Sequence, residues 1–444
     1  MRVRQGFASA AAFAQERRVV QDIGLVCLTS CVVVGALVGV AFPLFVVFAV
    51  VGLLVVWRTA LLGCLCAFVV VSSLSAMWWE RLDVDLPTSI SGQGVVVADP
   101  VRNFGTVEMI VAHENRRYLA VVDAAKTAGV GELQTGQQIE ISGRVSKLSG
   151  KKVAYLRRQH VAGKLVVATL ELVGPGNAMY QSANVVRSEL ARGANQLSAQ
   201  HAALLLGLTI GDDRNVDDKT REAFRESGIG HLTAVSGANV AFVLLLFAPI
   251  IQRFRLTGRF VMSVGVLLMF GLVTRWEPSV IRAEAMALAV LVGALIGRPA
   301  SLFRALCIGV GAAVAVDPFL VGSIGFLLSA SACLGMATIG AGLDGLLSRI
   351  NDRLGALRRA VSYTVGAQLG VLPMQLAVFG WPSLLSPLVN IVAAPLAAVV
   401  LVTGIPAMVL ASLTGAPVGA VFLMPAEIGI RCLSWLAHSA AGVS

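Results

Sequence analysis

The stretch Gly230-His-Leu-Thr-Ala-Val-Ser-Gly-Ala-Asn239 leads directly into an apolar segment, Val240 to Ile251, that contains no charged residue. Histidine, serine and asparagine side chains at the mouth of a membrane helix are costly to bury. Such groups usually line a cavity. The stretch therefore predicts a helical membrane protein with a polar interior surface.

The composition of the whole chain agrees with this prediction. Of the 444 residues, 57% are hydrophobic and 14% are charged, and the mean hydropathy is +0.81. These values exclude an ordinary soluble domain and indicate a polytopic α-helical membrane protein. The net charge of +10 suits contact with phospholipid headgroups or with a polyanion.

The cysteines and acidic residues give little reason to expect a metal or cofactor. All seven cysteines lie in apolar stretches, where they behave as small hydrophobes, although Cys27, Cys31, Cys64 and Cys66 could alternatively form a thiol pair or metal site. A cluster of aspartates invites a divalent ion, but helix caps and surface pairs explain it better; it comprises Asp212, Asp213, Asp217 and Asp218.

Residues 1–80 are predicted to form an anchor of three membrane helices, near 23–41, 44–57 and 60–79. Arginines before and between these segments place the amino terminus in the cytoplasm. The next domain then lies outside the cytoplasm.

Residues 81–178 change to short alternating runs such as Gly94-Val-Val-Val-Ala98 and Gln138-Ile-Glu-Ile-Ser142. Turn residues separate the runs at intervals typical of a small barrel. We expect a five-stranded OB-like barrel inserted into the membrane protein.

One part of this β domain is strongly basic and contains a tyrosine. Positive charges that neutralise a backbone, together with a stacking ring, are typical of a single-strand nucleic-acid groove. A solvated basic edge or contact with anionic lipid headgroups is the alternative. The predicted DNA-binding residues are Arg144, Lys147, Lys151, Lys152, Tyr155, Arg157, Arg158 and Lys164.

Residues 179–230 are predicted to form amphipathic and re-entrant interfacial helices. Val185, Val186, Leu190 and Leu197 recur at near-helical spacing, which suggests a helix on the membrane surface. Leu204 to Ile210 is apolar but too short to span a bilayer.

Residues 231–444 contain further apolar segments, the last of them near 405–423, followed by an expected amphipathic closing helix from Met424 to Ser444. Arginines cluster in alternate loops, near 253–259, 298–304 and 349–359. This pattern gives the same orientation as the amino-terminal segments, with the β domain outside.

Several polar residues fall at membrane depth in this bundle. Arg282 is expected to pair with Glu284 or another carboxylate, or to face water, because an unpaired buried arginine is very costly. Hydrogen bonding between helices is the simpler role for the amides and hydroxyls. The candidate translocation residues are His231, Ser236, Gly237, Asn239, Arg282, Glu284, Gln368, Gln375 and Asn390.

The sequence does not predict an enzyme. His231 and Ser236 are five residues apart on one segment, so their side chains diverge rather than form a catalytic pair. The chain also has no nucleotide-binding loop, so a driving force for transport is expected from elsewhere.

Two motifs resemble the ComEC-type competence DNA-uptake channel family: Leu204-Leu-Leu-Gly-Leu-Thr-Ile-Gly-Asp-Asp-Arg214 and Phe224-Arg-Glu-Ser-Gly-Ile-Gly230 with the stretch that follows it. Matches in the same order continue through Pro278-Ser-Val-Ile-Arg-Ala283, Gln368-Leu-Gly-Val-Leu-Pro-Met-Gln375 and Ser386-Pro-Leu-Val-Asn-Ile-Val-Ala-Ala-Pro395.

The resemblance implies a channel in the cytoplasmic membrane that passes one strand of external DNA into the cell during natural transformation. It assigns His231, Ser236, Gly237 and Asn239 to the pore and adds Arg282 and Asn390 from the bundle. Many members have histidine at the position of Asn239, which puts a titrating role there in doubt.

Many relatives also carry a metallo-β-lactamase-like domain, which needs clustered histidine and aspartate ligands. The five histidines here are far apart. The resemblance therefore implies partners besides single-stranded DNA and membrane lipids: a DNA-receptor protein, a separate nuclease and a cytoplasmic helicase. A permease for a small solute or lipid-linked precursor, or a non-transporting scaffold, remains the alternative.

Overall fold

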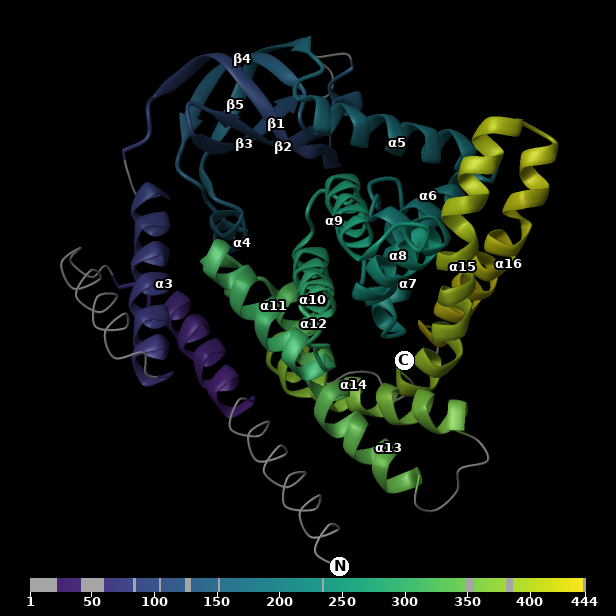
Figure 1. Cartoon of the computed structure of the whole chain (residues 1–444). Helices are drawn as coiled ribbons and strands as arrows, with labels where there is room; N and C mark the ends of the chain where they lie inside the picture. Colours follow the sequence, from purple (N-terminus) through teal and green to yellow (C-terminus); the bar gives the residue numbers. More distant parts are fainter. Residues whose placement is uncertain are drawn as a thin grey trace, which may run out of the picture.

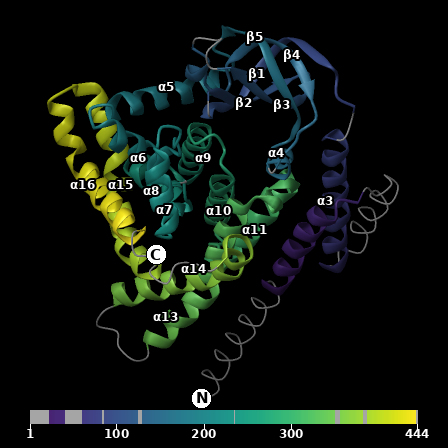
Figure 2. The same ribbon diagram turned by 180° about the vertical axis from the view of Figure 1, so that it is seen from behind.

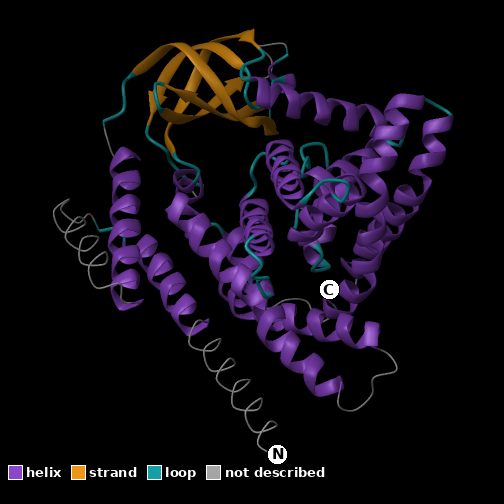
Figure 3. Ribbon diagram, viewed as in Figure 1, coloured by secondary structure: helices purple, strands orange, loops and turns teal. Residues whose placement is uncertain are grey.

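The computed structural model describes residues 22–40, 60–82, 85–103, 105–123, 129–150, 152–233, 235–348, 355–380 and 386–441. It contains a β-barrel and a large assembly of helices (Figure 3). The barrel lies across one end of the helices, as both views of the ribbon show (Figures 1 and 2). The predicted fold class, a polytopic α-helical protein with an inserted small β-barrel, is confirmed.

The elements before and within the barrel are the helix Asp22–Val38, α3 (Ala60–Leu82), β1 (Ser89–Asn103), β2 (Thr106–His113), β3 (Arg116–Asp123), η1 (Val130–Glu132), β4 (Gln138–Ser146), α4 (Val153–Arg158) and β5 (Val161–Gly174). The elements after it are α5 (Ala178–Ala194), α6 (Ala199–Ile210), α7 (Asp218–Glu226), η2 (Gly230–Leu232), α8 (Gly237–Ile251), α9 (Leu256–Val273), α10 (Pro278–Leu295), α11 (Leu302–Val316), η3 (Pro318–Gly322), α12 (Ile324–Gly335), η4 (Met336–Gly340), α13 (Ala341–Ser348), α14 (Gly355–Phe379), α15 (Ser386–Thr414) and α16 (Val418–Ala441).

Within the described ranges, six helices are long and apolar enough to cross a membrane: Cys64–Leu82, Leu256–Val273, Pro278–Leu295, Ile324–Ser348, Val389–Thr414 and Val418–Ala441. Shorter apolar helices accompany them, so the chain is a multi-pass membrane protein. The predicted segment 44–57 lies outside the described residues. Ser72 and Ser75 of α3 bond to the backbone of Val40 and Ala36, which joins α3 to the preceding helix.

The barrel is closed in the strand order β1-β2-β3-β5-β4. A parallel pairing of β3 with β5 and an antiparallel pairing of β1 with β4 complete the ring, an arrangement consistent with an OB-like domain. Successive side chains of a strand point alternately into and out of the barrel. In β4, Ile139 and Ile141 are buried, whereas Glu140 between them is exposed. The predicted alternating runs therefore build the barrel core.

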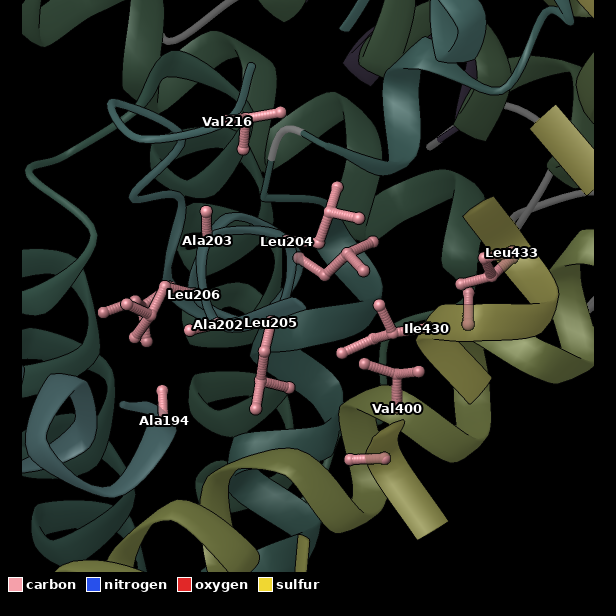
Figure 4. Packing of buried hydrophobic residues seen from close by; sticks show 14 of the residues in the cluster. Ala194, Ala202, Ala203, Leu204, Leu205, Leu206, Val216, Val400, Ile430 and Leu433 are labelled. Atoms are coloured by element: carbon pink, nitrogen blue, oxygen red, sulfur yellow. The ribbon is translucent and has the colours of Figure 1, made fainter. Parts of the chain in front are cut away.

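The largest apolar core surrounds α6. Leu204 and Leu205 face Val400 of α15 and Ile430 of α16 in a tightly packed cluster (Figure 4). Residues 202–210 are all buried. Because α6 is enclosed by protein, a helix too short to span the bilayer can lie at this depth with its backbone satisfied.

The helix predicted from the spacing of Val185, Val186, Leu190 and Leu197 is present as α5, but its buried face differs in part from the expectation. Val185 is 59% exposed, while Asn184 and Arg187 are buried. Gly193 of α5 approaches α15 so closely that a Cβ there would lie 1.9 Å from the carbonyl oxygen of Met408. The buried face of α5 therefore combines small and apolar residues, including Ala183 and Leu190, with the polar contacts of Asn184 and Arg187.

The end of the chain is also divided differently from the prediction. Helix α15 continues to Thr414 and α16 begins at Val418, so the expected membrane segment 405–423 is split by a turn. Gly415 has a φ of 69° and Pro417 follows a cis peptide bond, and both residues favour a break in the helix. The region expected to begin an amphipathic helix at Met424 instead continues a long apolar helix.

Candidate functional site

Asn239 ties the beginning of α8 to the end of α6. Its Nδ2 donates to the carbonyl oxygens of Leu208 and Thr209, at 2.7 and 3.2 Å. Its Oδ1 accepts from the hydroxyl and the backbone N–H of Ser236, at 3.0 and 3.3 Å. With 3% of its surface exposed, Asn239 satisfies two helix ends at once.

The loop before α8 is held by the start of α10. The hydroxyl of Ser279 donates to the carbonyl of Val235 at 2.6 Å, and Glu277 accepts from the backbone of the same residue. Burial, with the nearby Asp213 carboxylate, raises the pKa of Glu277 to about 7. The structure therefore builds a polar junction from α6, α8 and α10.

Arg282 lies next to this junction and is 2% exposed. Its Nη1 donates to Met286 Sδ and Cys333 Sγ, at 2.8 and 3.0 Å, and its Nε has no hydrogen-bond partner. The expected pair with Glu284 is not formed, because residues two apart on a helix point in different directions. Glu284 lies instead beside the backbone of Gly271 in α9.

The structure thus brings Ser236, Gly237, Asn239 and Arg282 together. The other predicted translocation residues lie elsewhere: His231 is exposed on η2, Gln368 and Gln375 are half-buried on α14, and Asn390 is buried on α15. Their role in a pathway stays a prediction.

The predicted DNA-binding residues lie mainly in the loop that joins β4 to β5 and carries α4. Arg144, Lys147, Lys152 and Tyr155 are exposed, and Lys164 is half-buried. Lys152 lies 3.7 Å from the carboxylate of Glu108 across the barrel surface. Lys151 lies outside the described residues, and Arg157 is half-buried.

The end of the same basic loop docks on the membrane helices. Arg158 Nη1 donates to the carbonyl of Gly322 at 2.5 Å, and His160 Nε2 lies 3.1 Å from Asp317 Oδ2. The His160 ring also stacks on Phe319, with 4.8 Å between ring centroids. We call these contacts the η3 joint; it fixes the basic loop against the ends of α11 and α12.

A buried charge network, which the sequence analysis missed, forms a second joint. Asp99 of β1 accepts from Arg275 Nε at 3.0 Å and lies 3.2 Å from Arg187 Nη2. Its other oxygen accepts from the N–H and hydroxyl of Thr135. Burial alone raises the pKa of Asp99, but the two guanidinium groups outweigh it and lower the pKa to about 2.

The network continues into the helices. Arg187 donates to Asp212 and to the carbonyl of Val273, each at 2.7 Å. Asp212 also accepts two bonds from Arg214, and Arg275 donates to Asn184. We call the whole set the Asp99 latch; it joins the barrel to α5, to the loop after α6 and to the loop after α9.

A weak signal for this latch is present in the sequence. Charged residues stand directly at helix ends in Asp212-Asp-Arg214 and Arg275-Trp-Glu277. We expected caps and surface pairs for the aspartates of the first segment. Asp217 does cap α7, since its side chain accepts from Thr220, and Asp218 pairs with Arg221. Asp212 differs because its partners come from distant segments.

Comparison with known proteins adds the following relationships. Residues 208–444 match the family model described as Competence protein. The chain is 24% identical over 352 residues to ComE operon protein 3 of Bacillus subtilis, covering 76% of this chain and 44% of that protein. It is 25% identical over 222 residues to the uncharacterized protein YcaI of Escherichia coli, covering 48% of this chain and 29% of that protein. The chain thus spans less than half of the length of these relatives, and no solved structure matches it.

Proposed function

Because this chain belongs to the Competence protein family, we propose that it acts in competence DNA uptake as a channel for single-stranded DNA in the cytoplasmic membrane. The description of the family model, Competence protein, agrees with this role. In this proposal the protein is not an enzyme, and it moves DNA without changing it.

The position of the basic loop is the observation that supports the proposal most strongly. The η3 joint holds this loop directly against the membrane helices, while Lys147, Lys152 and Tyr155 remain exposed beside it. Lysines attract the phosphate backbone by releasing its counterions, and a tyrosine ring can stack on bases. A strand bound there is already at the entrance to the bundle.

The loops of the bundle support an outward-facing barrel. The barrel domain contacts the helical part of the chain at Arg275, just after α9, and at Asp317, just after α11. The arginine-rich segments, including Arg255 and Arg304, lie at the opposite ends of these two helices. By the positive-inside rule, we propose that the barrel lies outside the cytoplasm and the amino terminus inside.

The test is charge reversal on the exposed part of the basic loop. We expect the triple variant Lys147→Glu, Lys152→Glu, Tyr155→Ala to take up far less labelled DNA and to lose part of its salt sensitivity. Arg158 stays unchanged, because its loss would also break the η3 joint. Lys219→Glu, an exposed lysine on α7, is the matched control and should take up DNA normally.

Normal uptake by the triple variant, in cells that depend on this chain, would contradict the proposal. A permease would give a different result, because saturable transport of a small solute would continue and DNA would have no effect on it.

A further inference from the structure

No acidic residue in the first turn of α8 balances its dipole, and the neighbouring Glu277 carboxylate is bound to the backbone of Val235. The helix begins at Gly237 after Ser236. The residue at the third helical position is the amide Asn239, whose oxygen is already bonded to Ser236. A helix of this length therefore presents a partial positive charge at Gly237.

A second positive group faces the same point. Arg282 Nη2 lies 3.0 Å from the position that a Cβ would take on Gly237. The acceptors of Nη1 are two sulfur atoms, which are weak acceptors, and Nε is unpartnered. In the part of the chain that the structure describes, this guanidinium forms no ion pair, although it is 2% exposed.

Two positive groups that converge in the interior, with no ion pair formed by the guanidinium, are costly to a membrane protein. An anion that contacts both groups lowers this cost. Planar guanidinium forks and helix amino ends are the two groups that proteins use most readily to hold phosphate oxygens. The absence of a side chain at Gly237 lets the guanidinium approach the backbone of α8 closely, since the methyl group of an alanine there would press on it.

We infer that Arg282 and the amino end of α8 at Gly237 form a binding site for a phosphodiester group of a single nucleic-acid strand. The inference rests on the proposed function and identifies one binding site along the proposed route of the DNA strand. A phospholipid headgroup carries a similar group, but burial of Arg282 within the bundle favours a ligand that enters through the protein. The site also lies on the barrel side of the bundle, one turn of α10 from Ser279, which bonds the loop before α8.

The experiment measures binding of a fluorescent oligothymidylate to the full chain in phosphatidylcholine nanodiscs. Arg282→Met should lower the affinity by roughly tenfold to a hundredfold, the effect of losing a charge-assisted hydrogen-bonded contact. It should also reduce the salt dependence by about one counterion. Gly237→Ala should weaken binding as well, because it fills the space beside Nη2.

Arg298→Met is the matched control, because it removes the same charge from the exposed loop at the other end of α10. We expect it to bind as the wild type does. The thermal midpoint of Arg282→Met should not fall, because replacing an unpaired buried charge by an apolar side chain is neutral or stabilising. A lower midpoint with unchanged affinity indicates a purely structural arginine and overturns the site.

Two further probes separate the possible ligands. An oligothymidylate with an uncharged methylphosphonate backbone should bind equally to wild type and Arg282→Met; a difference as large as with the charged strand overturns a phosphodiester site. If phosphatidylglycerol in the nanodisc abolishes the part of the affinity that depends on Arg282, a lipid occupies the site and the strand assignment is wrong.

The experiments distinguish failure of the phosphodiester site from failure of the proposed channel function. Binding that depends on Arg282 without any DNA uptake by the wild type would retain the site and reject the channel. Normal uptake by a variant whose affinity is unchanged would reject the site and retain the channel.

Discussion

At the scale of single residues, Asn239 shows why the motif that contains it needs a side-chain amide. The carbonyl groups at the end of α6 and the hydroxyl and N–H of Ser236 are satisfied by one group that both donates and accepts. A carboxylate cannot donate, and a hydroxyl cannot span both helices. The residue that we expected to line a pathway is therefore also a structural tie between α6 and α8.

Asn239→Leu tests this tie. It leaves the carbonyls of Leu208 and Thr209 buried without donors, and we expect a loss of about 2 to 3 kcal/mol of folding stability. The measurement is the thermal midpoint of the protein in nanodiscs. Asn239→His, which keeps a donor and an acceptor, should lose less, and a leucine variant as stable as wild type would count against the tie.

Glu277 predicts a pH dependence of stability. Its pKa is about 7 in the folded protein against an ordinary 4.5, owing to burial and then to Asp213. The folded state therefore binds the proton more tightly than the unfolded state, and stability falls as the pH rises from 4.5 through 7, by at most about 3 kcal/mol. Glu277→Gln should flatten this part of the curve of midpoint against pH. Any other group that titrates in the same range is common to both proteins and cancels in the difference.

At the scale of elements, α12 and α14 cross at glycine residues, where their backbones are in direct contact. A Cβ on Gly335 would lie 2.1 Å from the carbonyl oxygen of Gly366, and one on Gly370 would lie 2.4 Å from that of Ser331. Small residues at such crossings allow membrane helices to pack without large side chains between them. This contact positions α12, which carries Cys333 next to Arg282.

Gly370→Ala should separate the two helices. The added methyl group meets rigid backbone on both sides, and we expect a cost of about 1 to 3 kcal/mol, seen as a lower thermal midpoint. Gly342→Ala on α13 is the matched control, because a Cβ there has no neighbour within 4 Å. Equal midpoints for the two variants would mean that the crossing is looser than the structure shows.

The elements themselves were largely predictable, because their signals are local. Long apolar runs predict α9 and α10, and alternation in Gln138-Ile-Glu-Ile-Ser142 predicts β4. The buried face of α5 was not predictable, since the partner of Arg187 is Asp99, which lies far away in the chain. A hydrophobic pattern describes an average environment and does not identify which charge will be buried with which.

At the scale of the whole molecule, two clusters of polar contacts among the described residues attach the barrel to the helices. The Asp99 latch joins it to α5 and to the loops after α6 and α9, and the η3 joint holds the basic loop. Both joints are made by side chains whose partners are distant in sequence, so the sequence analysis could name the basic residues but could not divide them into docking and exposed ones. Two separate attachments fix the direction in which Tyr155 and Lys152 face.

Asp99→Asn tests whether the latch holds the barrel in place. It keeps the shape but removes the counter-charge of Arg187 and Arg275, and breaking a buried pair of this kind costs about 3 to 5 kcal/mol. We expect faster hydrogen exchange in α5 and in the loop after α9, while the barrel core around Ile139 stays protected. Glu108→Gln, which loosens the exposed contact with Lys152, is the control and should exchange as wild type does.

The stability of the Asp99→Asn variant should also differ from that of the wild type in a way that depends on pH. Since the pKa of Asp99 is lowered from 3.8 to about 2, its contribution is complete above pH 3.8 and disappears as the pH falls through 2. The difference between Asp99→Asn and wild type should therefore be constant from neutral pH to about pH 4 and narrow below it. A difference that already vanishes at pH 5 would show that another carboxylate, and not Asp99, holds the barrel on the helices.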